Sequence, residues 1–165
     1  LACLAGQPEP FCREIRYSAQ LHDIGKMSID AALLKKRGRL DPAERKEMDS
    51  HTRYGHRILQ DVPRLAMAAE IAFCHHEKWD GSGYPRRLRH DAIPLSARIV
   101  AVADVYDALR AERPYKPGHS HVETVRIMRE GDGILDPERH FDPALLELFH
   151  RHHQGMNDVW HRFHD

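Results

Sequence analysis

The sequence is poor in cysteine and has no excess of either charge. Its three cysteines, Cys3, Cys12 and Cys74, show no Cys-x-x-Cys spacing. A small, odd set of this kind indicates reduced thiols in the cytoplasm rather than a disulfide framework. Lysine and arginine number 25, as do aspartate and glutamate. This balance argues against a protein that coats DNA, but it leaves room for a small anionic ligand held by a few basic side chains.

The sequence also lacks long apolar runs, a secretory signal, internal repeats and any break in composition. The first two absences predict a cytoplasmic domain that makes no membrane contact. The last two, with a length of 165 residues, predict a single domain large enough to form its own core. Histidine, in contrast, is abundant at 14 residues, although residues 1–21 contain none.

Helical patterns dominate the chain and predict an all-α fold. Asp41, Pro42 and Glu44 form a typical helix start, with a cap, a proline at the first helical position and an acidic residue three places after the cap. The segment 78–94 is rich in glycine and proline and predicts a long ordered loop or a small hairpin. The expected helices cover 12–26, 40–61, 64–77, 94–110, 119–131 and 142–153.

The two ends of the chain differ from this pattern. The first residues, Leu-Ala-Cys-Leu-Ala-Gly, resemble the last turns of a helix that stops at Gly6, so we expect the sequence to be cut from something longer. We interpret 1–20 as the remnant of an upstream helix and its connection, 21–149 as the core that carries the motifs, and 150–165 as a histidine-rich tail. The tail histidines, which we expect to form a solvated polar face rather than a second metal site, are His150, His152, His153, His161 and His164.

Polar residues occur in the first two long helices where apolar neighbours predict burial. His22 and Asp23 are adjacent at the end of the first helix. Such a pair can bind a metal, but it is also explained by an aspartate that caps a loop and a histidine bonded to a backbone carbonyl. His51 lies on the apolar side of the second helix, where a lone histidine is either a ligand or a core residue with one hydrogen bond.

The next two helices add three more residues of this kind. His75 and His76 end the third helix, where one ring can reach the centre directly and the other from the side. Surface pairs of histidine are common, so the pair is weak evidence by itself. Asp104 lies in the middle of an apolar helix, where a carboxylate needs a compensating cation. Either a metal ion or a buried arginine such as Arg98 satisfies that need.

Together these residues predict a metal centre. Imidazole and carboxylate ligands without cysteine suit first-row metals such as iron, manganese or zinc. The set is too large for one tetrahedral zinc, so we expect at least two ions, which can activate water for in-line attack on a phosphodiester. Asp23 and Lys26 are the expected catalytic pair, with Lys26 stabilising the leaving oxygen or a phosphate. The predicted ligands are His22, Asp23, His51, His75, His76 and Asp104.

Four segments together resemble the HD-GYP domains, bacterial members of the HD phosphohydrolase superfamily that hydrolyse cyclic di-GMP. The likeness spans 21–149 and follows the order of the family's motifs. The segments are HDIGK at 22–26, HHEKWDGSGYP at 75–85, IPLSARIVAVADVYDAL at 93–109 and RPYK at 113–116. The resemblance implies an HD-domain helical bundle with a GYP loop between helices. It also implies two or three divalent ions, with iron or manganese preferred and zinc, nickel or magnesium as alternatives.

The resemblance further implies roles for residues around the metals. Tyr84 is similar to a residue that lines the substrate site, and Arg113 and Lys116 are similar to the family's contacts to the phosphates of the ligand. The implied activity is a metal-dependent phosphodiesterase that converts cyclic di-GMP to linear pGpG or GMP in bacterial second-messenger or two-component signalling. The family's habit also implies an upstream receiver or sensor domain, and a homodimer is compatible with it.

Two other functions stay open at this point. A catalytically weak module that senses cyclic di-GMP, or that docks GGDEF-type proteins through the GYP loop, uses the same surface without hydrolysis. A hydrolase of ordinary nucleotides explains the metals but leaves the GYP and RPYK segments without a role.

The chain departs from the family pattern in two places. The family has a further histidine ligand, sometimes with a glutamate, upstream of the HDIGK segment. Residues 1–21 supply no histidine, and Glu9 and Glu14 do not match. We expect truncation to explain this difference, so that the chain lacks one ligand and binds metal weakly. His90 stands where the family often has glycine, which we expect to alter the loop without touching the metals.

Overall fold

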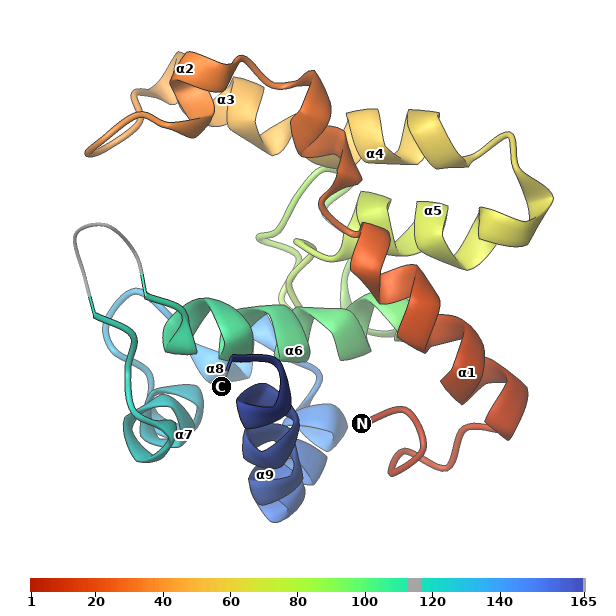
Figure 1. The fold of residues 1–165 in the computed structure, drawn as a ribbon, viewed down its shortest axis with the longest axis vertical. Helices are drawn as coiled ribbons and strands as arrows, with labels where there is room; N and C mark the ends of the chain where they lie inside the picture. Colours follow the sequence, from red (N-terminus) through yellow and green to blue (C-terminus); the bar gives the residue numbers. More distant parts are fainter. Residues whose placement is uncertain (113–116, 165) are drawn as a thin grey trace.

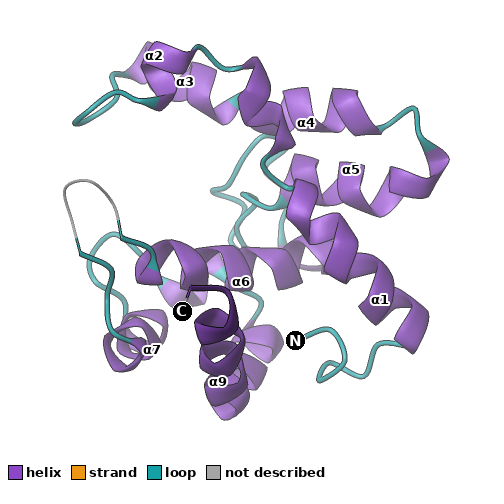
Figure 2. Ribbon diagram, viewed as in Figure 1, coloured by secondary structure: helices purple, strands orange, loops and turns teal. Residues whose placement is uncertain are grey.

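The computed structural model describes residues 1–112 and 117–164, and all regular structure in these ranges is helical (Figures 1 and 2). The prediction of an all-α fold is confirmed for this part of the chain. The segment 78–94 is a loop with one short 3-10 turn, so the loop rather than the hairpin is observed. The α-helices are α1 (Glu9–Ser18), α2 (Ala31–Leu34), α3 (Pro42–Asp49), α4 (His51–Leu59), α5 (Ala66–Cys74), α6 (Leu95–Arg110), α7 (His121–Glu130), α8 (Pro137–His140) and α9 (Pro143–His164).

Helix α6 lies at the centre of the molecule. Helices α4 and α5 lie side by side on one side of it, and α7 and α9 lie on the other (Figure 1). Val102 of α6, Met128 of α7 and Phe149 of α9 are fully buried in one cluster. Ala68 and Ala72 of α5 belong to a smaller cluster that faces α4. Helices α5 and α6 each contact several other helices. Polar side chains that point from them into the interior are therefore held in fixed positions.

The first predicted helix is shorter than expected. Helix α1 ends at Ser18 instead of continuing to Gly25, and two 3-10 turns follow, at Ala19–Leu21 and Ile24–Ser28. The second turn packs against α4 so closely that a Cβ on Gly25 would lie 1.9 Å from the carbonyl oxygen of His51. This tertiary contact, rather than helix propensity, therefore decides the backbone around the HD pair.

The predicted helix over 40–61 is divided in two. The capping box is confirmed, because the Glu44 amide donates to Asp41 Oδ1 at 2.9 Å and the Asp41 amide donates to Glu44 Oε2 at 2.9 Å. The division between α3 and α4 lies at Ser50, whose backbone remains near helical values at φ −67° and ψ −14°. Its hydroxyl donates to the Lys46 carbonyl at 2.9 Å, a local bond that is typical of bent helices.

The third and the last helix also differ from their predicted bounds. Helix α5 ends at Cys74, so His75 is its C-cap and not part of its last turn. Helix α9 is kinked at His152, whose φ of −124° and ψ of 15° are not helical, close to the predicted end at 153, and helical structure then continues to His164. The prediction of a solvated face is correct for His152 and His161, which are exposed, but not for His150 and His153, which are half-buried. The His153 ring also bonds to that of His121 across 2.8 Å.

The first residues form a closed helical turn, as predicted. The Gly6 amide donates to the Cys3 carbonyl at 3.1 Å, and the Gln7 amide donates to the Ala2 carbonyl at 3.2 Å. This pair of bonds is the Schellman arrangement that ends helical turns. Among the described residues, we find no helix with the length and apolar character needed to cross a bilayer.

Candidate metal centre

The six predicted ligands converge where four segments meet. These are the 3-10 turns after α1, the start of α4, the end of α5 and the middle of α6. His22 Nε2 lies 3.4 Å from Asp23 Oδ2 and 3.6 Å from Asp104 Oδ1. The convergence that the sequence predicted is therefore observed. The residues whose ligand atoms all lie within 4.8 Å of one another are Asp23, His51, His75 and His76.

Backbone carbonyls orient three of the imidazoles. In each ring Nδ1 lies within hydrogen-bond distance of a carbonyl oxygen, which can only accept, so Nδ1 carries a proton. In the neutral ring Nε2 then keeps its lone pair and directs it into the centre, as is typical of histidines that bind metals. The acceptors are Ala19 for His22 at 2.8 Å, Met48 for His51 at 2.7 Å and Ile71 for His75 at 3.0 Å.

The donor set fits a metal cation. The Nε2 atoms of His51 and His75 lie 3.5 Å apart. Burial lowers the pKa of both rings, that of His75 to about 4, so both rings are neutral at pH 7 and their lone pairs face each other. Asp23 Oδ1 lies 3.4 Å from His51 Nε2, and it is buried and accepts no hydrogen bond. Converging lone pairs and a carboxylate oxygen without a donor require a cation, and a divalent ion supplies it.

Asp104 belongs to the centre and not to a salt bridge with Arg98. The Arg98 guanidinium donates instead to Asp91 at 2.9 Å and to Asp142 at 2.7 Å. Burial opposes ionisation of Asp104, but the neighbouring His22 imidazole outweighs it and lowers the pKa of the carboxyl group. The carboxylate therefore remains charged and available as a ligand.

Lys26 lies at the edge of the centre. Its ammonium group donates to Asp23 Oδ2, and its side chain is 42 % exposed. Burial disfavours the charged form of Asp23, yet His22 and Lys26 together hold the pKa of the carboxyl group well below its usual range. One oxygen of Asp23, Oδ1, therefore faces the lone pairs of His51 and His75. The other oxygen, Oδ2, faces the cationic groups of His22 and Lys26.

The GYP turn folds back over the end of α5, as predicted. The Tyr84 amide donates to the His76 carbonyl at 3.2 Å, and the two rings lie 4.9 Å apart. A Cβ on Gly83 would lie 2.3 Å from the Lys78 amide nitrogen, so only glycine permits this close approach. The chain therefore delivers Tyr84 to the side of the metal centre.

Glu77 holds this turn, a role that the sequence reasoning missed. The residue is only 2 % exposed. Its carboxylate accepts from the Arg86 amide at 2.7 Å and from the Leu88 amide at 2.9 Å. In the sequence, only its position directly after His75 and His76 indicated that Glu77 could have a role at the site. Two charge-assisted bonds from one buried carboxylate fix the loop relative to α5.

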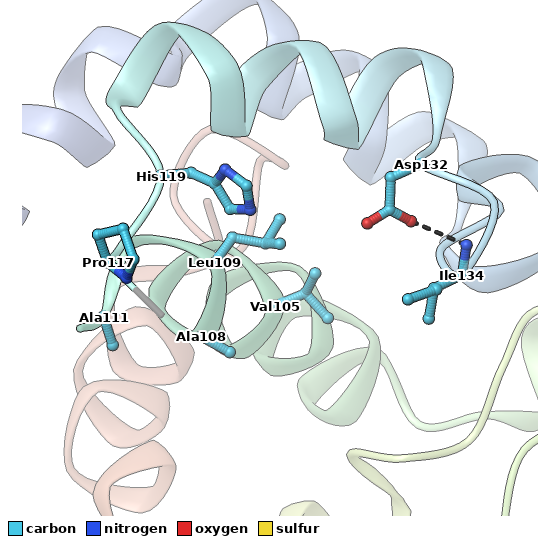
Figure 3. A pocket seen from close by; sticks show the side chains of 8 residues that line it. All are labelled: Val105, Ala108, Leu109, Ala111, Pro117, His119, Asp132 and Ile134. Carbon is cyan, nitrogen blue, oxygen red and sulfur yellow. Dashed lines mark hydrogen bonds between the residues drawn. The ribbon is translucent and has the colours of Figure 1, made fainter. Parts of the chain in front are cut away.

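A second cavity lies away from this centre, between α6 and α7 (Figure 3). Its volume is about 250 Å³, and Val105, Leu109, His119 and Ile134 are among the residues around it. It contains none of the predicted ligands. The predicted phosphate contacts Arg113 and Lys116 fall in 113–116, outside the described residues, so their role stays a prediction.

Metal binding at pH 7 is expected to release about one proton, which comes from His22. Burial disfavours protonation of this ring, but Asp104 and Asp23 outweigh it and raise its pKa to about 10. The ring is therefore protonated in the metal-free protein, and a cation that takes its Nε2 must displace the proton. Metal affinity should rise with pH up to about 10.

Calorimetric titration with Mn²⁺ in buffers of different ionisation enthalpy measures this proton count. The His22→Asn variant is the control, because it has no such proton to lose. Proton release that is equal in the two proteins would contradict His22 as a ligand.

Comparison with known proteins agrees with the geometry. The HD domain family matches residues 1–145. A cyclic di-GMP phosphodiesterase of Vibrio cholerae is 48% identical over 80% of this chain and 27% of the relative, and one of Thermotoga maritima is 43% identical over 95% and 42%. A 3′3′-cGAMP-specific phosphodiesterase 2 of Vibrio cholerae is 45% identical over 92% and 28%. The chain thus spans between about a quarter and two fifths of the length of these relatives. The chain belongs to the HD domain family, and its motifs make it an HD domain of the GYP type.

Proposed function

We propose that the chain is the catalytic domain of a metal-dependent phosphodiesterase that hydrolyses cyclic di-GMP to linear pGpG or GMP. The observation that carries the proposal is the convergence of imidazole and carboxylate atoms around Asp23 Oδ1, which accepts no hydrogen bond. The names of the relatives from Vibrio cholerae and Thermotoga maritima support the substrate class.

The proposed cofactor is a pair or trio of divalent ions. Iron or manganese suits a mixed set of imidazole and carboxylate ligands, with zinc, nickel or magnesium as alternatives. Such ions supply Lewis acidity, which activates a water molecule and stabilises charge on a phosphate. The residues proposed to hold them are His22, Asp23, His51, His75, His76 and Asp104.

The chain's own side chains have distinct tasks in this proposal. Asp23 is proposed to hold the ions through Oδ1 while Lys26 binds its other oxygen. Lys26 is partly exposed at the edge of the centre, where its charge can stabilise a phosphate or the departing oxygen. Tyr84 is proposed to line the substrate site beside His76. Docking of GGDEF-type proteins, a homodimer and an upstream receiver or sensor domain stay predictions.

The test is hydrolysis of cyclic di-GMP by the chain loaded with Mn²⁺ or, without oxygen, Fe²⁺. We expect linear product that is separated by anion-exchange chromatography, loss of activity with a chelator, and recovery when the metal is restored. If the fully loaded chain bound cyclic di-GMP without turnover, the hydrolase proposal would be wrong and a sensing module would replace it.

A further inference from the structure

A polar cavity lies next to the metal centre, between α3, the start of α4 and the GYP turn. Its volume is about 430 Å³, and its walls include Arg45, Asp49, Arg53, Tyr84 and Arg87. Tyr84 connects it to the centre through its ring contact with a metal-site histidine, and Asp49 precedes another by two residues. A ligand that reaches the metals from this side must therefore pass these five side chains.

Asp49 has an unused acceptor in this cavity. Its Oδ1 atom is buried and accepts no hydrogen bond, although the Tyr84 hydroxyl lies close enough to the carboxylate group to interact with it. Buried carboxylate oxygens in folded proteins nearly always have a donor. An oxygen of this kind in the wall of a cavity indicates that a ligand brings the donor.

Arginines surround this acceptor. Arg45 lies one helical turn before Asp49 and Arg53 one turn after it, so all three share a face that lines the cavity. Arg53 also donates to the Pro85 carbonyl at 3.3 Å, which holds the turn against α4. Arg87 lines the cavity from the GYP turn. Its φ of 56° is a left-handed backbone conformation that residues other than glycine rarely adopt. The cavity thus presents one acceptor among several donors.

We propose that this cavity binds a guanine base of the cyclic dinucleotide and that Asp49 selects guanine over adenine. This inference rests on the proposed function, because it names the specificity of the same site. The N1–H and the N2 amino group of guanine are adjacent donors, which one carboxylate accepts together. Adenine offers an unprotonated N1 at that edge, whose lone pair faces the carboxylate and repels it.

The arginines add to this selection. Guanine O6 and N7 are both acceptors and suit a guanidinium, whereas adenine places an amino group where guanine has O6. Arg45 and Arg53 flank Asp49 and can donate to these atoms while the carboxylate accepts. Relatives of this chain are named for dinucleotides that differ in their bases, cyclic di-GMP and 3′3′-cGAMP, so contacts to the base are where such enzymes must differ.

The test compares cyclic di-GMP with cyclic di-AMP, which contains no guanine, in the Mn²⁺-loaded chain and its Asp49→Asn variant. The ratio of kcat/KM for the two substrates should fall about tenfold or more, mainly through KM. An asparagine offers one donor and one acceptor, so cyclic di-AMP should be used no less well than by the parent chain. The control is Glu47→Gln, which removes the same charge from an exposed position of α3 that lies outside the cavity.

Metal content and the dissociation constants of both dinucleotides are measured alongside. The inference would be overturned if Asp49→Asn lowered kcat/KM equally for both substrates or lost metal. It would also be overturned if Glu47→Gln changed the ratio of kcat/KM as much as Asp49→Asn does. Turnover with an unchanged ratio refutes the role of Asp49 and leaves the proposed function intact. Absence of turnover with guanine-selective binding that Asp49→Asn removes refutes the proposed function alone. Failure of the parent chain to bind either dinucleotide refutes both.

Discussion

Replacing Asp23 with alanine is expected to lower kcat/KM for cyclic di-GMP by at least about a thousandfold and to reduce bound metal. Among the described residues, this carboxylate is the only one that contacts His51 through one oxygen and Lys26 through the other. Its removal leaves neutral imidazoles to hold the ions and frees Lys26 from its partner. Steady-state kinetics and metal analysis of the purified variant measure the two effects.

The matched control is Asp61→Ala. Asp61 is exposed in the turn after α4, so its loss should change neither turnover nor metal content. Hydrolysis by Asp23→Ala at a rate close to that of the parent chain would refute the assignment of the centre.

Among single substitutions to alanine in the 3-10 turn Ile24–Ser28, Gly25→Ala should lower the stability of the fold most. The added Cβ would lie 1.9 Å from the His51 carbonyl oxygen and 2.4 Å from the Gly55 amide nitrogen. Both are backbone atoms of α4, so no side chain can move aside to relieve the clash. We expect the free energy of unfolding to fall by about 3 kcal/mol or more. Urea denaturation of the metal-free chain at fixed pH measures the loss.

Gly155→Ala is the control for this experiment. The position lies in α9, and an added Cβ there meets no atom within 4 Å. Because alanine favours helix over glycine, this variant should gain up to about 1 kcal/mol. Equal stability of the parent chain and Gly25→Ala would show that the turn does not pack on α4 as the structure has it.

The residues of the candidate metal centre could be predicted from the sequence because polar residues stand there in apolar settings. Asp104 lies among the buried residues of α6, and His51 is fully buried at the start of α4. Burying such groups is costly without a cation, so a sequence that buries several of them predicts a metal centre. The structure added what spacing cannot supply: the 3.5 Å approach of His51 to His75.

Features that depend on contacts distant in sequence could not be predicted. Helix propensity favoured a continuous helix to Gly25, but packing of that glycine on α4 ends it earlier. Glu77 carries no pattern of its own, since its partners are backbone amides of a loop that follows. Asp49 resembles an ordinary acid on a solvated helix face, and only the fold places it in a cavity beside Tyr84.

Anomalous diffraction from crystals of the manganese- or iron-loaded chain is the most direct measurement of the central claim. The proposed metal centre predicts at least two anomalous peaks, each about 2.0–2.2 Å from ligand atoms of the set that includes Asp23, His51 and His75. Peaks confined to other histidines, such as the His121–His153 pair, or no peak among these ligands in a fully loaded chain, would contradict it.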